Sequence, residues 1–131
     1  MLKTKSIIGP KELEDGLRIS VMSRHTLNDG TTPHPKISKE SYDLWMPVLA
    51  PPQRLVGDYY KRGLSWETFE KRYLDYLNQP NVQREVSWLA QRGLEETITI
   101  LCVEDSPEFC HRRLLVEECK KYQPNLVLDI R

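Results

Sequence analysis

The last third of the chain concentrates the residue types that could do chemistry. Cys102 and Glu104 stand at the end of a β-branched, apolar run, and Cys110, His111 and Arg112 follow at the start of a predicted helix. A helix N-terminus lowers the pKa of a thiol, so Cys110 is the candidate nucleophile or redox thiol. His111 or Glu104 would then serve as the acid or base.

A second set of residues predicts an anion site beside this turn. Arg24 follows the first predicted strand, and Arg112 lies at a helix start, where free backbone N–H groups attract negative charge. Together they would bind the phosphate or carboxylate group of a small ligand. Tyr60 and Trp66 stand at a junction between two predicted helices, and we expect them to form a wall of the ligand pocket.

Two other interpretations use the same turn. Cys102, Cys110 and His111 could hold a structural metal ion through two sulfurs and a nitrogen. Their spacing is not that of a familiar zinc knuckle, and adjacent helical residues point about 100° apart, which argues against a shared ion. Alternatively, Cys102, His111 and Arg112 could form a buried hydrogen-bonded network that only stabilises the turn.

The balance of charged residues limits the classes of partner that the protein can bind. The 131 residues include 19 Lys and Arg against 19 Asp and Glu, which gives a formal net charge of zero. Neutrality disfavours a broad nucleic-acid surface. A nucleic-acid or protein-interaction module remains an alternative through local basic residues: Lys61, Arg62, Arg112 and Arg113.

The length of the chain and its cysteine content indicate the number of domains and the cellular compartment. A chain of 131 residues fits one domain, residues 1–131. It contains no run near the roughly 20 apolar residues that cross a bilayer, so no membrane contact is expected. Three cysteines make an odd set that suits a reducing cytoplasm. No glycine-rich phosphate loop, nucleophile-elbow serine or helical zinc pair is present, and the sequence indicates no particular cofactor.

The elements that would position these residues follow an α/β order. Strands are predicted at 17–23, 97–103 and 126–130, with a further short one at 6–8. Helices are predicted from Ser38 to about 49, over 53–62, from Ser65 to about 77, over 82–93, and from Ser106 to about 122. This order predicts a single layered α/β domain with a small, mainly parallel sheet of about three to four strands flanked by helices. Ligands bind beyond the carboxyl ends of such strands, where both candidate clusters lie.

Several segments together resemble the domain-of-unknown-function 488 family of small bacterial and archaeal proteins. They are residues 15–24, 45–51, 63–74 and 98–112, of which the last is the most specific because a strand ending in Cys-x-Glu precedes Cys-His-Arg. The resemblance implies an α/β domain and names no activity. It matches motif positions at Arg24, Cys102, Glu104, Cys110, His111 and Arg112. The chain departs from the family pattern after Arg24, where His-Thr-Leu-Asn stands in place of Trp-Pro-Arg-Gly.

Overall fold

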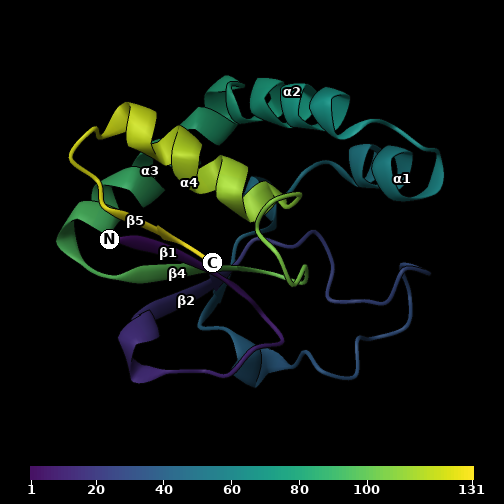
Figure 1. The fold of residues 1–131 in the computed structure, drawn as a ribbon, viewed down its shortest axis with the longest axis horizontal. Helices are drawn as coiled ribbons and strands as arrows, with labels where there is room; N and C mark the ends of the chain where they lie inside the picture. Colours follow the sequence, from purple (N-terminus) through teal and green to yellow (C-terminus); the bar gives the residue numbers. More distant parts are fainter.

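A parallel sheet of five strands forms the centre of the computed structural model, which describes all residues from Met1 to Arg131 (Figure 1). All pairings are parallel, and the strand order is β3-β2-β4-β1-β5. The α/β class and the parallel sheet are as predicted, with five strands instead of three or four. The strands are β1 (Leu2–Ser6), β2 (Leu17–Ser20), β3 (Leu44–Trp45), β4 (Ile98–Cys102) and β5 (Leu128–Ile130).

Strand β4 is the central strand, as its apolar sequence predicts. It pairs with β2 on one side and β1 on the other, and all five of its residues are buried. Ile98 and Ile100 join the main core beneath the helices, while Leu101 and Cys102 belong to a smaller apolar cluster that includes Cys110. The carboxyl end of the most buried strand therefore delivers Cys102 to the site.

Four helices complete the fold: α1 (Gln53–Lys61), α2 (Trp66–Leu77), α3 (Pro80–Glu95) and α4 (His111–Tyr122). Figure 1 shows α2, α3 and α4 above the sheet and α1 on the right, near the carboxyl ends of the strands. The Ser65 side chain accepts a hydrogen bond from the Thr68 amide and caps α2. Gly63, just after α1, has a φ of 71°, the left-handed conformation typical of a glycine that follows a helix. No helix has the length and apolar character needed to span a membrane.

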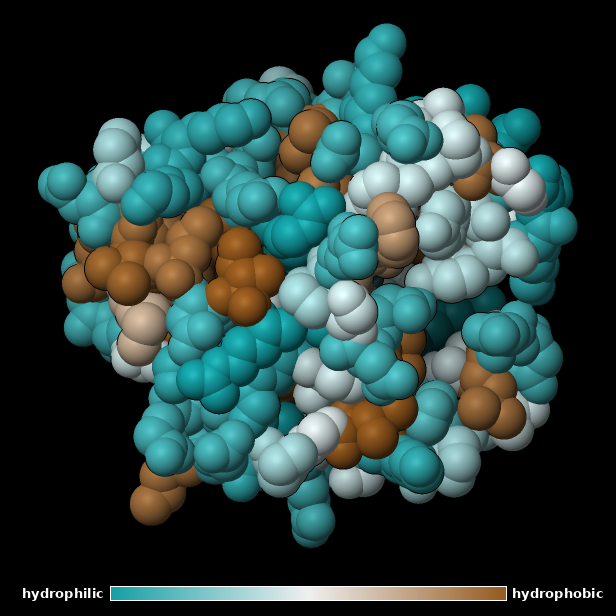
Figure 2. Space-filling view, in the orientation of Figure 1, coloured by the Kyte–Doolittle hydropathy of each residue, from teal (hydrophilic) through white to brown (hydrophobic).

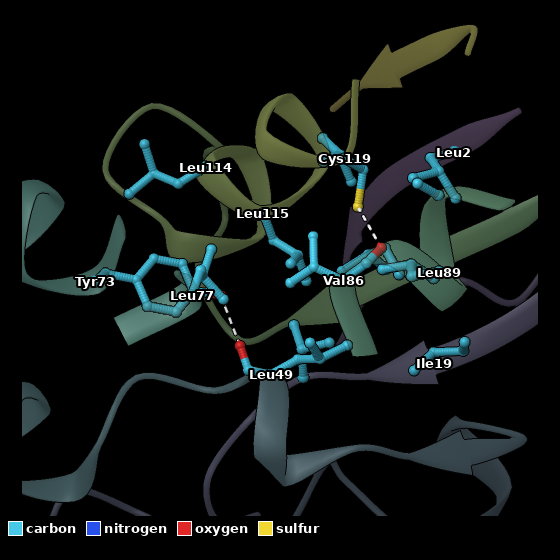
Figure 3. Close-up of a cluster of buried hydrophobic side chains, with 14 of the residues drawn as sticks. Leu2, Ile19, Leu49, Tyr73, Leu77, Val86, Leu89, Leu114, Leu115 and Cys119 are labelled. Carbon is cyan, nitrogen blue, oxygen red and sulfur yellow. Dashed lines mark hydrogen bonds between the residues drawn. The ribbon is translucent and has the colours of Figure 1, made fainter. Parts of the chain in front are cut away.

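The main hydrophobic core lies between the sheet and the helices (Figure 3). Two buried polar atoms in it bind backbone carbonyls. The Tyr73 hydroxyl donates to Leu49 O at 2.6 Å, and Cys119 Sγ lies 3.8 Å from Val86 O. Cys119 is thus a core residue on α4, apart from the other two cysteines.

The opposite face of the sheet is covered by chain segments that carry a buried ionic network. Lys5 Nζ lies 2.9 Å from Asp15 Oδ1, and the Arg18 guanidinium also binds the Asp15 carboxylate. The Thr99 hydroxyl donates to Asp15 O at 2.6 Å. These buried charges are paired, as burial requires, and they fasten the segment after β1 to β2 and β4.

The predicted helix from Ser38 to 49 is wrong. The chain instead forms short 3-10 turns at Lys39–Ser41 and Pro47–Leu49, with strand β3 between them. Backbone groups along the edge of β2 need partners, and this segment provides them: Asp43 N donates to Arg18 O, and Met46 N to Ser20 O. Long-range strand pairing therefore overrides the local helical spacing.

Other boundaries also differ from the sequence prediction. The first strand is Leu2–Ser6 rather than 6–8, because Lys3 and Lys5 point to the polar face of the sheet. The last helix begins at His111 rather than near Ser106, so residues 103–110 form a loop. The Ser106 hydroxyl still accepts a hydrogen bond from the Glu108 amide, but this closes only a local turn.

Candidate functional site

A cavity of about 540 Å³ opens beyond the carboxyl ends of β2 and β4. Its walls come from segment 22–30, helix α1, the start of α2 and the loop between β4 and α4. Figure 2 shows the surface hollowed on the right, below the position of α1 in Figure 1. Seven of the eight predicted site residues line this one cavity: Arg24, Tyr60, Trp66, Cys102, Glu104, Cys110 and His111.

The floor of the cavity brings together Cys102, Cys110 and His111. Their side-chain donor atoms all lie within 4.8 Å of one another, and Cys102 Sγ is 3.7 Å from His111 Nδ1. Cys110 is the N-cap of α4 and not a residue within the helix, so the divergence of about 100° between adjacent helical residues does not separate it from His111. Its φ of −134° and ψ of 139° are extended, which turns its side chain toward that of His111.

The imidazole of His111 has a fixed orientation. Its Nε2 lies 2.8 Å from Val21 O, and a carbonyl can only accept, so Nε2 carries the proton and donates it. Nδ1 consequently faces Cys102 with its lone pair when the ring is neutral. The ring also packs edge-on against Tyr73, with centroids 5.6 Å apart. The loop after β2, through Val21, thus orients the base in the floor.

The two sulfurs of the floor differ in acidity. Burial alone would raise the pKa of Cys110, but the neighbouring Cys102 thiol and His111 imidazole, with the charge of Arg112, bring that pKa well below its ordinary value. The adjacent Cys110 sulfur, followed by burial, raises the pKa of Cys102 well above the usual range. Burial also raises the pKa of Cys119, to about 12. Of the three thiols, Cys110 is therefore the one whose pKa is shifted toward the thiolate.

Glu104 joins the loop to helix α1. The Tyr60 hydroxyl donates to Glu104 Oε1 across the cavity mouth. Burial, and then this carboxylate, raise the pKa of Tyr60, so its hydroxyl keeps its proton. The pair offers a carboxylate and a phenolic proton to a ligand in the cavity.

The rim of the cavity is cationic. The Arg24 guanidinium donates to Gly30 O at 3.0 Å and to Gln53 Oε1, both neutral acceptors, so its charge is not compensated. Arg54 and Lys61 also line the cavity, and neither side chain forms an ion pair.

The remaining charged groups of the lining do not cancel this excess. Arg62 is paired with Asp58, through Nε and Oδ1 at 2.5 Å. Glu104 is the one carboxylate in the lining, and it is occupied by Tyr60. The lining therefore carries more positive than negative charge, although the whole chain is neutral.

Aromatic side chains form the wall beside the floor. The Trp66 ring stacks on Phe69 at a centroid distance of 5.2 Å and meets Tyr59 and Phe109 edge-on at 5.7 and 5.5 Å. Phe109 and Tyr60 are about half exposed, at 52% and 53%. They leave apolar surface open to a ligand at the mouth.

Two further lining residues, Arg54 and Phe109, were not expected from the sequence. Arg54, Gly57 and Lys61 are spaced three and four residues apart, so they share one face of α1. This spacing is the sequence signal that places Arg54 beside Lys61 at the cavity. Phe109 falls within the helix that the sequence predicts from Ser106 to about 122. Residues 103–110 instead form a loop, and this conformation brings Phe109 to the cavity.

Arg112, the eighth predicted site residue, does not line the cavity. It is fully buried, and its guanidinium donates to Glu104 O at 2.7 Å, Asp105 O at 3.5 Å and Arg131 O at 3.0 Å. Its Nε also approaches Arg131 O, at 3.3 Å. These donors are therefore committed to backbone carbonyls, and Arg112 fixes the loop between β4 and α4 against the last residue of the chain.

Replacing Arg112 with alanine should lower the free energy of unfolding by about 3 kcal/mol or more, because a fully buried side chain and its bonds to three carbonyls would be lost. Arg72→Ala is the matched control. Arg72 is an exposed arginine on α2 that pairs with Asp58 at 3.3 Å and does not contact this loop. Its removal should cost less than about 1 kcal/mol. Urea denaturation measures both changes, and equal losses would contradict the role assigned to Arg112.

The acidity of Cys110 predicts its alkylation profile. An unperturbed thiol loses roughly tenfold in rate for each pH unit below its pKa. Cys110, which lines the cavity, should keep reacting with iodoacetamide well below that range, while Cys119 stays inert because it lies in the core, away from the cavity, and its pKa is raised. Peptide mass spectrometry can follow each site against pH. A Cys110 profile identical in folded and urea-unfolded protein would contradict the lowered pKa.

The comparisons with known proteins agree with the motif at this turn. A model of the active DUF488-N3 subclade matches residues 2–123, which include the strand end, the loop and the helix start described above. Comparisons with curated proteins and with solved structures found no match. With nearly its whole length matched by that model, the chain belongs to the DUF488 family.

Proposed function

We propose that this protein is a thiol-dependent enzyme that acts on a small molecule with an anionic group. One observation carries the proposal: a single cavity of about 540 Å³ combines a thiol and imidazole floor with a cationic rim. Its volume lies within the range of small-molecule sites. The description of the matching subclade as active is in keeping with retained chemistry.

The roles follow from position. Arg24 and Arg54 at the rim attract the anionic group, and the amides of the first turn of α4 add partial positive charge at the floor. Cys110 Sγ attacks an electrophilic atom of the substrate. The sulfur–substrate bond forms as the bond to the leaving group breaks, and water then displaces the sulfur to complete a hydrolysis.

Proton transfer falls to the groups beside the sulfur. His111 Nδ1 faces the thiols and can accept a proton from one of them and return it to the leaving group. Glu104 can accept a proton from the attacking water once a substrate displaces the Tyr60 hydroxyl. Arg112 acts through these residues as a positioning residue, since it holds the loop that carries Glu104.

The interaction-module alternative receives less support from the geometry. The unpaired cations Arg24, Arg54 and Lys61 surround a concave site and form no extended flat stripe. Because the whole chain has a net charge of zero, it also lacks the overall electrostatic attraction to phosphates that nucleic-acid-binding proteins use. The three free cysteines fit a cytoplasmic location, which we include in the proposal.

The test is a thermal-shift screen with phosphate- and carboxylate-bearing metabolites. A true ligand at 100 times its Kd should stabilise the wild type by about 2.7 kcal/mol. Arg24→Ala should weaken this effect. Arg72→Ala is the matched control, since Arg72 is an exposed arginine outside the cavity lining.

Intact-mass spectrometry of the same mixtures tests the thiol step. A substrate should leave a covalent adduct on Cys110 in the wild type and none in Cys110→Ser. Cys119→Ser, which alters the core cysteine, should keep the adduct. If no anionic compound shifts the wild type, or if shifts and adducts persist in both Arg24→Ala and Cys110→Ser, the proposal is wrong.

A further inference from the structure

The floor of the cavity also has the geometry of a metal centre. We infer that Cys102, Cys110 and His111 bind one zinc-type divalent ion through two sulfurs and Nδ1, with a fourth coordination position facing the cavity. This inference concerns the same side chains as the proposed thiol chemistry, but it stands on separate observations.

The distances fit a tetrahedral ion. Zinc bonds of about 2.3 Å to sulfur and 2.0–2.1 Å to nitrogen place two tetrahedral ligands about 3.6 to 3.8 Å apart. Cys102 Sγ and His111 Nδ1 are 3.7 Å apart, so this edge of the tetrahedron is already formed. All three donor atoms lie within 4.8 Å of one another, and the other edges need to shorten by at most about 1 Å.

The surroundings of His111 match those of a metal-binding imidazole. Such a histidine donates its other ring N–H to a carbonyl or carboxylate, which fixes the ring and leaves the ligating nitrogen free. His111 does this through Nε2 and Val21 O at 2.8 Å. Because Val21 immediately follows β2, the sheet itself holds Nδ1 toward the two sulfurs.

Cys110 supplies the second sulfur, and hydrogen bonds fix the backbone of this residue. Its amide donates to Pro107 O, and its own carbonyl accepts from Arg113 N, both at 3.3 Å. Arg112, one residue beyond His111, fixes the preceding loop through Glu104 and Asp105. The three ligands therefore come from one strand end and one helix start, both fixed independently of an ion.

The donor set selects the kind of ion. Two thiolates and one imidazole prefer zinc and other soft or borderline ions, whereas magnesium and calcium prefer oxygen ligands. Two thiolates also neutralise a divalent charge, which lowers the cost of holding it in a buried site. His25 is not a fourth ligand, because its Nε2 is 2.7 Å from Ser20 Oγ and its ring stacks on Tyr42.

Three protein ligands leave one position for water or a ligand of the cavity, since all three side chains line it. This is the coordination of catalytic rather than structural zinc sites. The bound ion would take the Cys110 sulfur as a ligand and share its electron pairs, so that sulfur would be a weaker nucleophile in the loaded protein. Metal loading and the proposed thiol reaction thus compete for the same sulfur.

Cobalt titration of chelator-treated, reduced full-length protein tests the inference. Co²⁺ should bind at one ion per chain, with thiolate-to-cobalt charge-transfer bands and the strong visible bands of tetrahedral cobalt, and Zn²⁺ should displace it. Excess Mg²⁺ should not. Zn²⁺ should also protect Cys110 from iodoacetamide.

Three variants locate the ion. Cys102→Ser and Cys110→Ser should each weaken Co²⁺ binding more than about 100-fold, beyond the 10- to 100-fold typical of changes to groups that only orient the ligands. Serine is a favoured N-cap, so Cys110→Ser should fold, and circular dichroism checks this. Cys119→Ser is the matched control and should bind as the wild type does, because Cys119 lies in the core (Figure 3).

The outcomes separate the two proposals. No charge-transfer band in wild type, unchanged binding in folded Cys110→Ser, or an equal loss in Cys119→Ser would overturn the metal site and leave the thiol enzyme standing. If the metal-bound protein binds anionic ligands and the metal-free protein forms no Cys110 adduct, the metal site holds and the thiol mechanism fails.

Discussion

The buried guanidinium of Arg112 is the constraint on which the site depends. A cation at a helix start opposes the helix dipole, and here it is held by carbonyl groups of the loop after β4 and of the residue after β5. Its bonds to Glu104 O, Asp105 O and Arg131 O join the loop after β4 to the end of β5. These bonds stabilise a loop conformation in which Cys110 is the N-cap of α4 instead of a residue within a longer helix.

The cavity has a cationic rim and a floor of thiols, and the inward orientation of Arg112 contributes to this difference. Arg112 is turned inward to the backbone, so the cations that can meet a ligand come from other elements: Arg24 after β2, and Arg54 and Lys61 on α1. The floor beneath them carries a thiol of lowered pKa beside an imidazole of fixed orientation. A neutral chain thus presents a positive rim above a sulfur-rich floor, and both the proposed thiol chemistry and the proposed metal binding would use that contrast.

The sequence was informative where local patterns decide the structure. The apolar run ending at Cys102 predicted the central strand, and helical spacing predicted α2 and α3. The clustering of the candidate residues was also predictable, since seven of the eight line one cavity. Strand β3 was missed because its pairing with β2 is long-range. The loop at 103–110 was missed because bonds between Arg112 and Arg131, distant in sequence, determine it.

The most direct test of this account measures the alkylation of Cys110 against pH in Arg112→Lys, with Cys119 as an internal reference. A lysine ammonium is a single compact charge and cannot bridge the same three carbonyls as a planar guanidinium. The loop should loosen, Cys110 should move away from Cys102 and His111, and its profile should shift toward that of an ordinary thiol. A folded Arg112→Lys variant that keeps the wild-type profile would contradict the claim that Arg112 positions the reactive centre.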